Sequence, residues 1–202
     1  QLESWAEAEV ALEKALPGYT ASLDKLSLES EEGKAPALKI EGITVMLSEI
    51  LLKSGKFAEA KSFFEDLLIK DEGGRERVMT LLKQQEHTLL ELKELMNKIR
   101  TVPSFMEGYA RVLRQLGEVD DCLRALTLIR VLSSADRSKK YQPGWWEWQL
   151  LTFQLWLDLG INHGQRQALE NIKAKYQEYD GLGVLDRSGR KPDFLKIKNQ
   201  AR

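Results

Sequence analysis

Apolar residues recur at helical spacing along most of this chain, and this periodicity limits its fold more than any other feature. Glycine and proline stand mainly where one periodic segment gives way to the next. No stretch shows the strict alternation of apolar and polar residues that marks a half-buried strand. The sequence therefore predicts an all-α fold of stacked antiparallel helix pairs.

The expected helices cover most of residues 1–180. We expect them over residues 4–16, 35–54, 57–70, 75–100, 103–116, 119–132, 145–159 and 165–179. The segment 75–100 is expected to be one long helix, because its apolar residues form a seam with alternating steps of four and three. Residues 181–202 contain several glycines and an excess of basic residues, so we expect an irregular basic tail outside a helical domain of residues 1–180.

Composition limits the partners and the compartment. Basic and acidic residues are nearly balanced, 30 against 31, so no overall positive field attracts nucleic acid or an anionic membrane. No apolar run approaches the roughly 20 residues of a membrane-spanning helix. The single cysteine excludes an internal disulfide and fits the cytoplasm best, although other compartments stay open. Because the chain starts at Gln1 in helical periodicity, we expect it to be part of a longer protein, whose targeting segment would lie upstream.

Two helix pairs share one succession of small and large residues around a glycine turn. The first has Leu47, Ser48, Gly55, Phe57, Ala60 and Phe64, and the second has Tyr109, Ala110, Gly117, Val119, Cys122 and Leu126. This pattern resembles the tetratricopeptide repeat family, in which small side chains let neighbouring helices pack closely. We therefore expect Ala60 and Cys122 to be buried. The resemblance implies a right-handed superhelix, an α-solenoid.

The rest of the chain matches the family less regularly. The opening helix resembles the second half of a repeat through Trp5, Ala8, Leu12 and Ala15. The last pair, around Gly160, is a looser copy, and the segment 75–100 has no place in a period of about 34 residues. An irregular helical-repeat protein therefore stays open as an alternative.

The resemblance also implies a function. The first helices of stacked repeats line a concave face that commonly holds a peptide or a partner helix. On this chain that face would carry Val45, Glu49, Leu52, Lys53, Glu107, Arg111 and Arg114. The leading interpretation is a protein-interaction scaffold that binds another protein or a peptide, uses no cofactor and is not an enzyme.

The helical domain of an enzyme is the first alternative. Cys122 would be its nucleophile, with His87 or His163 as the base. The position of Cys122 in a small-residue slot favours a buried packing thiol instead. One cysteine and two histidines do not supply a zinc tetrad, so we expect no metal site.

Aromatic residues gather in one part of the chain. They are Tyr141, Trp145, Trp146, Trp148, Phe153 and Trp156. Tryptophans so close in sequence cannot all face one side of a helix, and large apolar residues are mostly buried. We expect most of them to pack between helices and one, Trp145 or Trp148, to stay partly accessible to a partner.

The basic tail carries the last alternative, weak nucleic-acid binding. Its basic residues are Arg187, Arg190, Lys191, Lys196, Lys198 and Arg202. The loop with Arg137, Lys139 and Lys140 could add to such a surface. A solvated chain end is the favoured interpretation, because basic composition alone is a weak signal and terminal segments are commonly untied.

Overall fold

The computed structural model describes residues 50–70, 72–135 and 140–201, together with positions 7, 10, 11, 14 and 46. Within these residues the fold is all-α, as the periodicity predicts. Extended backbone pairs there only as an isolated antiparallel bridge between Ile69 and Ile99. None of the helices in this part of the chain is long and apolar enough to cross a membrane.

The described helices follow one another with short connections. They are α3 (Phe57–Leu68), the 3-10 turn η1 (Glu72–Gly74), α4 (Arg75–Lys83), α5 (Leu89–Lys98), α6 (Pro103–Leu116), α7 (Val119–Ala135), α8 (Pro143–His163), α9 (Arg166–Gly181), α10 (Val184–Ser188) and α11 (Lys191–Gln200). Residues 50–53 are also helical and lead into α3 through a turn at Gly55. Helices α6 and α8 end at Gly117 and Gly164, whose positive φ angles of 74° and 67° favour glycine.

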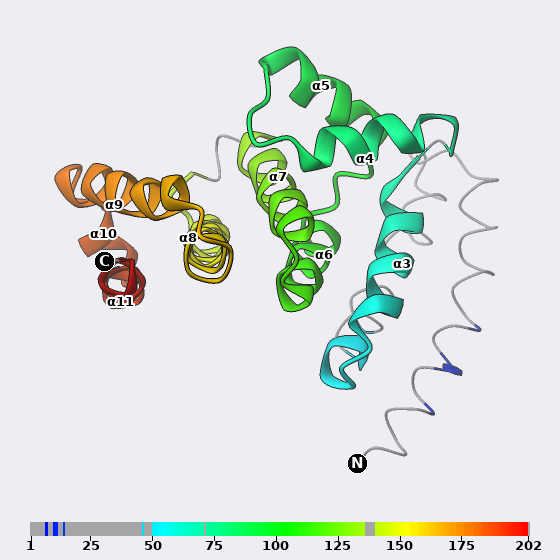
Figure 1. Ribbon diagram of the computed structural model, residues 1–202, viewed down its shortest axis with the longest axis horizontal. Coiled ribbons are helices and arrows are strands. Elements are labelled where there is room, and N and C mark those ends of the chain that lie inside the picture. The colour runs from blue at the N-terminus through cyan, green and yellow to red at the C-terminus, as the bar shows by residue number, and fades with distance from the viewer. Residues whose placement is uncertain are drawn as a thin grey trace.

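The longer helices form a row in which each packs against the next. Helix α6 contacts α3, α7 and α8, and α8 contacts α7, α9 and α11 (Figure 1). Helix α4 packs against α7, and α5 lies against α4 at the upper edge of the view. One continuous hydrophobic core runs from α3 to α11.

Small residues stand where helices approach closely. Ala60 and Cys122 are both fully buried in this core, which confirms the prediction made from their positions. Gly160 on α8 shows the closest approach, because a Cβ atom there would lie 2.1 Å from Leu169 Cδ2 on α9. The equivalent residues of the opening helix, and Leu47 and Ser48 of the first pair, lie outside the described residues.

The prediction of one long helix over residues 75–100 is wrong. The chain leaves helical geometry at Gln84 and starts α5 at Leu89. Thr88 caps the new helix: its hydroxyl accepts from the Glu91 backbone N–H, and the Glu91 carboxylate accepts from the Thr88 backbone N–H. This capping box stabilises a helix start inside an apolar seam that looks continuous in the sequence.

The expectation of an irregular tail after residue 180 is also wrong. Residues 184–188 and 191–200 form α10 and α11, and α11 packs against α8 and α9. Phe194 and Ala201 are fully buried, and the Phe194 ring meets the Phe153 ring at 4.8 Å between centroids. Phe194 and Ile197 of α11 belong to the same core as the apolar residues of α8, so this segment covers the end of the helix row.

A polar network lies between α3, α6 and α7. Arg124 Nη1 donates to Glu65 Oε1 at 2.8 Å, and the Tyr109 hydroxyl donates to the same oxygen at 2.9 Å. Lys61 Nζ donates to Asp121 Oδ1 at 2.7 Å beside them. Burial and the Glu65 carboxylate raise the pKa of Tyr109, so its hydroxyl keeps the proton that it donates. These contacts tie three helices together at defined positions.

Candidate partner-binding site

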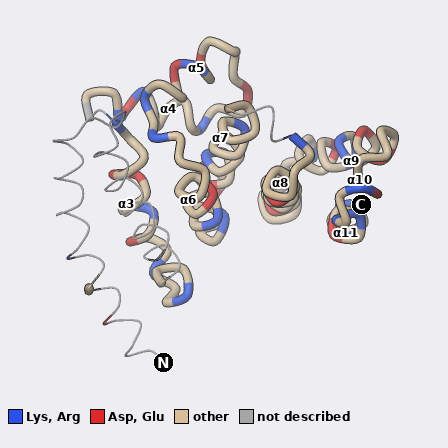
Figure 2. Tube along the Cα trace, turned by 180° about the vertical axis from the view of Figure 1, so that it is seen from behind, with Lys and Arg blue, Asp and Glu red and all other residues tan. Residues whose placement is uncertain are grey.

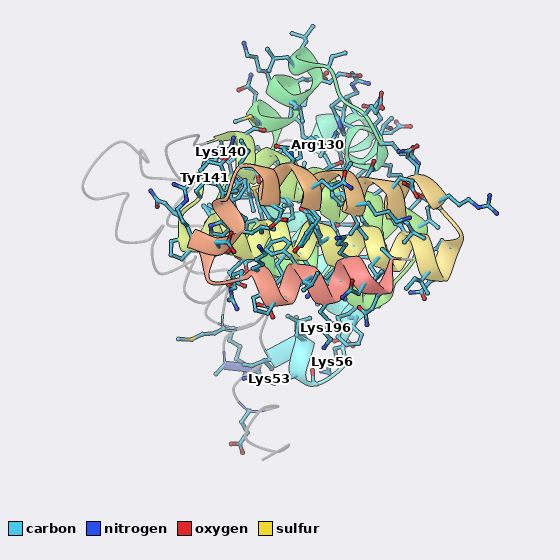
Figure 3. The ribbon with its side chains drawn as sticks, turned by 90° about the vertical axis from the view of Figure 1, so that its left-hand side faces the viewer. Lys53, Lys56, Arg130, Lys140, Tyr141 and Lys196 are labelled. Atoms are coloured by element: carbon cyan, nitrogen blue, oxygen red, sulfur yellow. The ribbon has the colours of Figure 1, made fainter. Side chains whose placement is uncertain are left out.

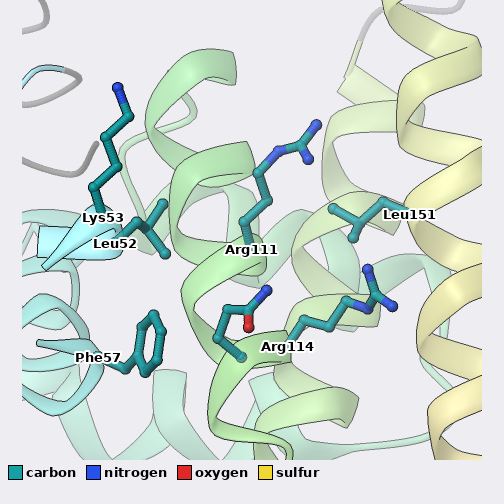
Figure 4. A pocket seen from close by; sticks show the side chains of 7 residues that line it. Leu52, Lys53, Phe57, Arg111, Arg114 and Leu151 are labelled. Carbon is teal, nitrogen blue, oxygen red and sulfur yellow. The ribbon is translucent and has the colours of Figure 1, made fainter. Parts of the chain in front are cut away.

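A pocket of about 340 Å³ opens between the helical residues 50–53 with the start of α3, helix α6 and helix α8. Its lining combines cationic and apolar side chains: Leu52, Lys53, Phe57, Arg111, Arg114, Gln115 and Leu151. Figure 4 shows Leu52 and Phe57 on one side, the arginines on α6 in the middle and Leu151 on the α8 side. We call this the α6 pocket.

Helix α6 supplies the polar part of the lining because its two faces differ. Val112 and Leu113 are fully buried in the core, whereas Arg111 and Gln115 are exposed on the opposite face. Residues three and four positions apart share a helix face, so Arg111, Arg114 and Gln115 point to the same side. The amphipathic pattern of α6 therefore positions these three side chains together.

The two arginines are oriented by different neighbours. Arg111 Nε and Nη2 both donate to Glu107 Oε1, at 3.1 and 2.7 Å, one turn earlier on α6. Arg114 reaches across to α8, where Nε donates to Asp158 at 2.7 Å and Nη1 donates to Gln154 at 2.6 Å. Arg114 thus links two helices, while the Arg111–Glu107 pair stays on one.

The arrangement suits an anionic group next to an apolar one. A guanidinium carries more N–H donors than these contacts use, so Arg111, whose side chain is 47% exposed, keeps donors for a ligand. Leu52 and Leu151 supply apolar surface within the same pocket. Figure 2 shows Lys and Arg segments at the end of α6 and near the start of α3. The pocket can therefore hold a carboxylate and an aliphatic or aromatic group side by side.

The structure brings together four of the nine partner-binding residues predicted from the sequence. Leu52, Lys53, Arg111 and Arg114 all line the α6 pocket. Glu107 lies beside it and holds Arg111. Val45 and Glu49 fall outside the described residues.

The expectation that Trp145 or Trp148 is accessible is wrong, because the two side chains are only 6% and 7% exposed. Trp145 packs against the rings of Trp146 and Tyr179. Trp148 Nε1 donates to Glu107 Oε2 at 3.1 Å, so it positions the carboxylate that holds Arg111. Helix α8 contacts α6, α7, α9 and α11, so both tryptophans lie on sides that neighbouring helices cover.

Phe57, Gln115 and Leu151 line the pocket although the sequence pattern did not place them there. Gln115 could have been found, because it lies four residues after Arg111 and so shares its helix face. Leu151 had no such signal, since its place depends on how α8 packs beside α6.

The candidate nucleophile Cys122 lies in a different environment. Its side chain is fully buried, and burial, with the nearby Asp158 carboxylate second, raises the pKa of the thiol to about 11. His163 Nε2 donates to the Gly117 carbonyl oxygen at 2.7 Å, and His87 contacts the Leu81 carbonyl and Arg130. Both histidines therefore hydrogen-bond to groups other than the thiol, which counts against a thiolate nucleophile.

Several basic residues of the segment 181–202 serve its folding. Arg190 pairs with Glu147 on α8, and Lys191 Nζ lies 2.7 Å from Asp180 and 3.0 Å from Asp186. Arg137, Lys139 and Arg202 lie outside the described residues. Among the residues that the structure places, no cluster of His, Cys, Asp and Glu is arranged to hold a metal ion.

Comparisons with known proteins do not assign a family or a function to this chain. No family model, curated protein or solved structure matches this chain. The fold and the pocket therefore define an all-helical protein with a mixed cationic and apolar surface pocket, and its function is argued from these features.

Proposed function

We propose that this chain is a protein-interaction module that acts by binding rather than by catalysis. Its ligand would be a segment of a partner protein, an extended peptide or a helix, held on the face of α6 that carries the α6 pocket. The observation that carries this proposal is the meeting of Leu52, Lys53, Arg111 and Arg114 at one pocket. These residues come from two separate helical segments, and the repeat pattern of the sequence predicts all four on one face.

The spacing of the helix pairs supports a repeat array of the tetratricopeptide kind. The bridge between Ile69 and Ile99 brings together the two ends of the segment that contains α4 and α5. Without this segment, the turns at Gly55 and Gly117 would lie about 34 residues apart, which is the length of one repeat. The segment would then be an insertion between two repeats. The helical residues 50–53 before α3, helix α6 and helix α8 would belong to the first helices that line a concave face.

The lining predicts the chemistry of the bound segment. It should present an acidic side chain to Arg111, because charge-assisted hydrogen bonds are stronger than neutral ones. It should also place an apolar side chain near Leu52 and Leu151, whose burial would add to the affinity.

Site-specific photocrosslinking tests the proposed surface. p-Benzoyl-phenylalanine in place of Gln115 would be expected to crosslink the partner from the α6 pocket, whereas the same replacement at the exposed Gln177 on α9 would not. In parallel, Arg111→Glu should weaken binding of that partner about tenfold or more, because a charged hydrogen bond becomes a repulsion.

The matched control for Arg111→Glu is Arg166→Glu on α9, since Arg166 is also an exposed arginine outside the pocket. Circular dichroism should show the same helix content for both variants and the parent chain. Equal crosslinking from positions 115 and 177, or equal loss of binding in both variants, would show that the α6 pocket is not the binding surface.

A further inference from the structure

A second pocket, of about 240 Å³, lies between the turn before α8 and helix α10. Its lining is Tyr141, Trp146, Val184, Arg187 and Ser188. Figure 3 shows Tyr141 and Lys140 side by side in this turn. The aromatic cluster and the basic C-terminal segment, which the proposed function does not use, meet at this pocket, which we call the α10 pocket.

A hydrogen bond and ring contacts hold Tyr141 in place at the α10 pocket. Tyr141 has a φ angle of 69°, a left-handed conformation that is uncommon for residues other than glycine. The indole N–H of Trp146 donates to the Tyr141 carbonyl oxygen at 3.1 Å and so fixes this turn. The Tyr141 ring lies 5.1 Å from the Trp145 ring and 5.8 Å from the Trp146 ring, yet its side chain remains 39% exposed. A ring of a ligand would meet a positioned aromatic surface there.

Arg187 supplies a positive charge to the lining. Its Nε donates to the Gly183 carbonyl oxygen at 3.3 Å, and within the described part of the chain it forms no ion pair. The nearby basic residues Arg190 and Lys191, in contrast, each form ion pairs with carboxylates. Lys140 is not part of the lining, but its positive charge lies close by, with Nζ 4.8 Å from the centroid of the Tyr141 ring.

The other polar group of the lining is already used. Ser188 Oγ donates to the Leu185 carbonyl oxygen at 2.6 Å and accepts from the Arg190 backbone N–H at 2.9 Å. The terminal guanidinium nitrogens of Arg187 and the hydroxyl of Tyr141 are therefore the groups of the lining that a ligand can engage. Trp146 and Val184 supply the apolar floor.

We propose that the α10 pocket binds an aromatic ring that carries a carboxylate. The ring would pack on Tyr141, Trp146 and Val184, and the carboxylate would accept hydrogen bonds from Arg187. The pocket is smaller than the roughly 300–1,000 Å³ of sites for larger ligands, so one ring with a short acidic arm fits it. A free aromatic acid and the C-terminal aromatic residue of a peptide share this chemistry.

Titration of the whole chain with N-acetyl-phenylalanine tests the proposal, followed by the indole N–H signal of Trp146 in nitrogen-15 NMR spectra. N-acetyl-phenylalaninamide, which lacks the carboxylate, should bind about tenfold more weakly or worse, because it cannot form the charged hydrogen bond. Arg187→Gln should remove this preference, and Arg166→Gln on α9 should keep it. Tyr141→Asn, which tolerates the left-handed turn, should weaken binding of both probes.

Equal affinities for the acid and the amide in the parent chain would overturn the proposal. So would an unchanged preference in Arg187→Gln, the absence of any shift of the Trp146 signal, or tighter binding of adenosine monophosphate than of the aromatic acid. A hexapeptide that ends in phenylalanine identifies the source: binding at least tenfold tighter than the single residue supports a peptide terminus, and equal binding supports a free aromatic acid.

Discussion

The hairpin of α6 and α7 and the pair of α4 and α5 have similar apolar patterns in sequence but very different surroundings in the molecule. Helix α6 packs between α3, α7 and α8, and its residues Tyr109, Val112 and Leu113 are fully buried. Helix α5 rests mainly on α4 (Figure 1). Leu95 is its one buried side chain, and Leu89 and Leu90 are 67% and 76% exposed.

Helical periodicity, as these two regions show, does not tell how many neighbours a helix has. A helix with partners on several sides gains stability from each of them, whereas α5 gains it from one face and from its capping box. We therefore expect the α6–α7 hairpin to open only with the whole molecule and α5 to open locally. Matched substitutions in the two regions test this difference.

The largest difference is expected between matched Leu→Ala changes. Leu113→Ala removes a fully buried side chain from α6 and should lower the free energy of unfolding by about 3–5 kcal/mol, because it leaves a cavity. Leu90→Ala on α5 should change it by less than about 0.5 kcal/mol. Urea denaturation measures both, and similar losses would mean that α5 is as well packed as α6.

Ion pairs should show the same contrast. Arg124→Met should cost about 2–3 kcal/mol, because it leaves the Glu65 carboxylate, with a side chain only 15% exposed, without its closest cation. Arg77→Met, which removes the exposed pair between α4 and Glu94 on α5, should have a much smaller effect. Adding Glu65→Gln to Arg124→Met should restore part of the loss, and a double-mutant cycle by urea denaturation measures this coupling.

The next-largest loss of stability is expected where α8 and α9 approach each other closely. Gly160→Ala should destabilise the protein by about 1–3 kcal/mol, because the new Cβ atom would meet Leu169 and force α8 and α9 to adjust. Gly144→Ala at the start of α8 meets no atom within 4 Å and should be neutral or slightly stabilising. Thermal unfolding compares the two, and Leu169→Ala should relieve the strain of Gly160→Ala if the contact is its cause.

The smallest effect is expected for the cap of α5. Thr88→Ala removes the hydroxyl that accepts from the Glu91 backbone N–H and should destabilise this helix by about 1 kcal/mol. Hydrogen exchange should become faster in residues 89–98 and stay unchanged in α6 and α7. Faster exchange in both regions would show that α5 unfolds together with the core, which would remove the distinction.

The site was predictable where it depends on one helix. The resemblance to a repeat assigns Arg111 and Arg114 to one face of α6, and both line the α6 pocket. Their ion pairs depend on other elements: Arg114 contacts Asp158 because α8 lies beside α6. The burial of Trp148 has the same origin, since its indole N–H donates to Glu107 on α6.

Two of the wrong predictions, one long helix over residues 75–100 and an irregular tail after residue 180, have different causes. The break before α5 had a local signal, because Thr88 and Glu91 have the spacing of a capping box, but the apolar seam around them outweighed it. The helix α11 had only a weak signal, since glycine and basic residues surround Phe194 and Ile197. The burial of these two side chains against α8 and α9 stabilises a helix that its own residues do not favour strongly.

The sequence was enough to establish that the described chain is helical and that a glycine ends a helix at Gly117, and its repeat pattern predicted the burial of Ala60 and Cys122. These features depend on backbone geometry and on the period of one helix, which neighbouring residues encode directly. The sequence ended the helix that begins near Trp145 at Leu159, whereas α8 continues through Gly160 to His163. Only the packed molecule established which helices touch, which tryptophans are covered, and that Leu52, Arg111 and Leu151 share a pocket. Such contacts depend on the summed packing of residues far apart in the chain, and no short segment contains that information.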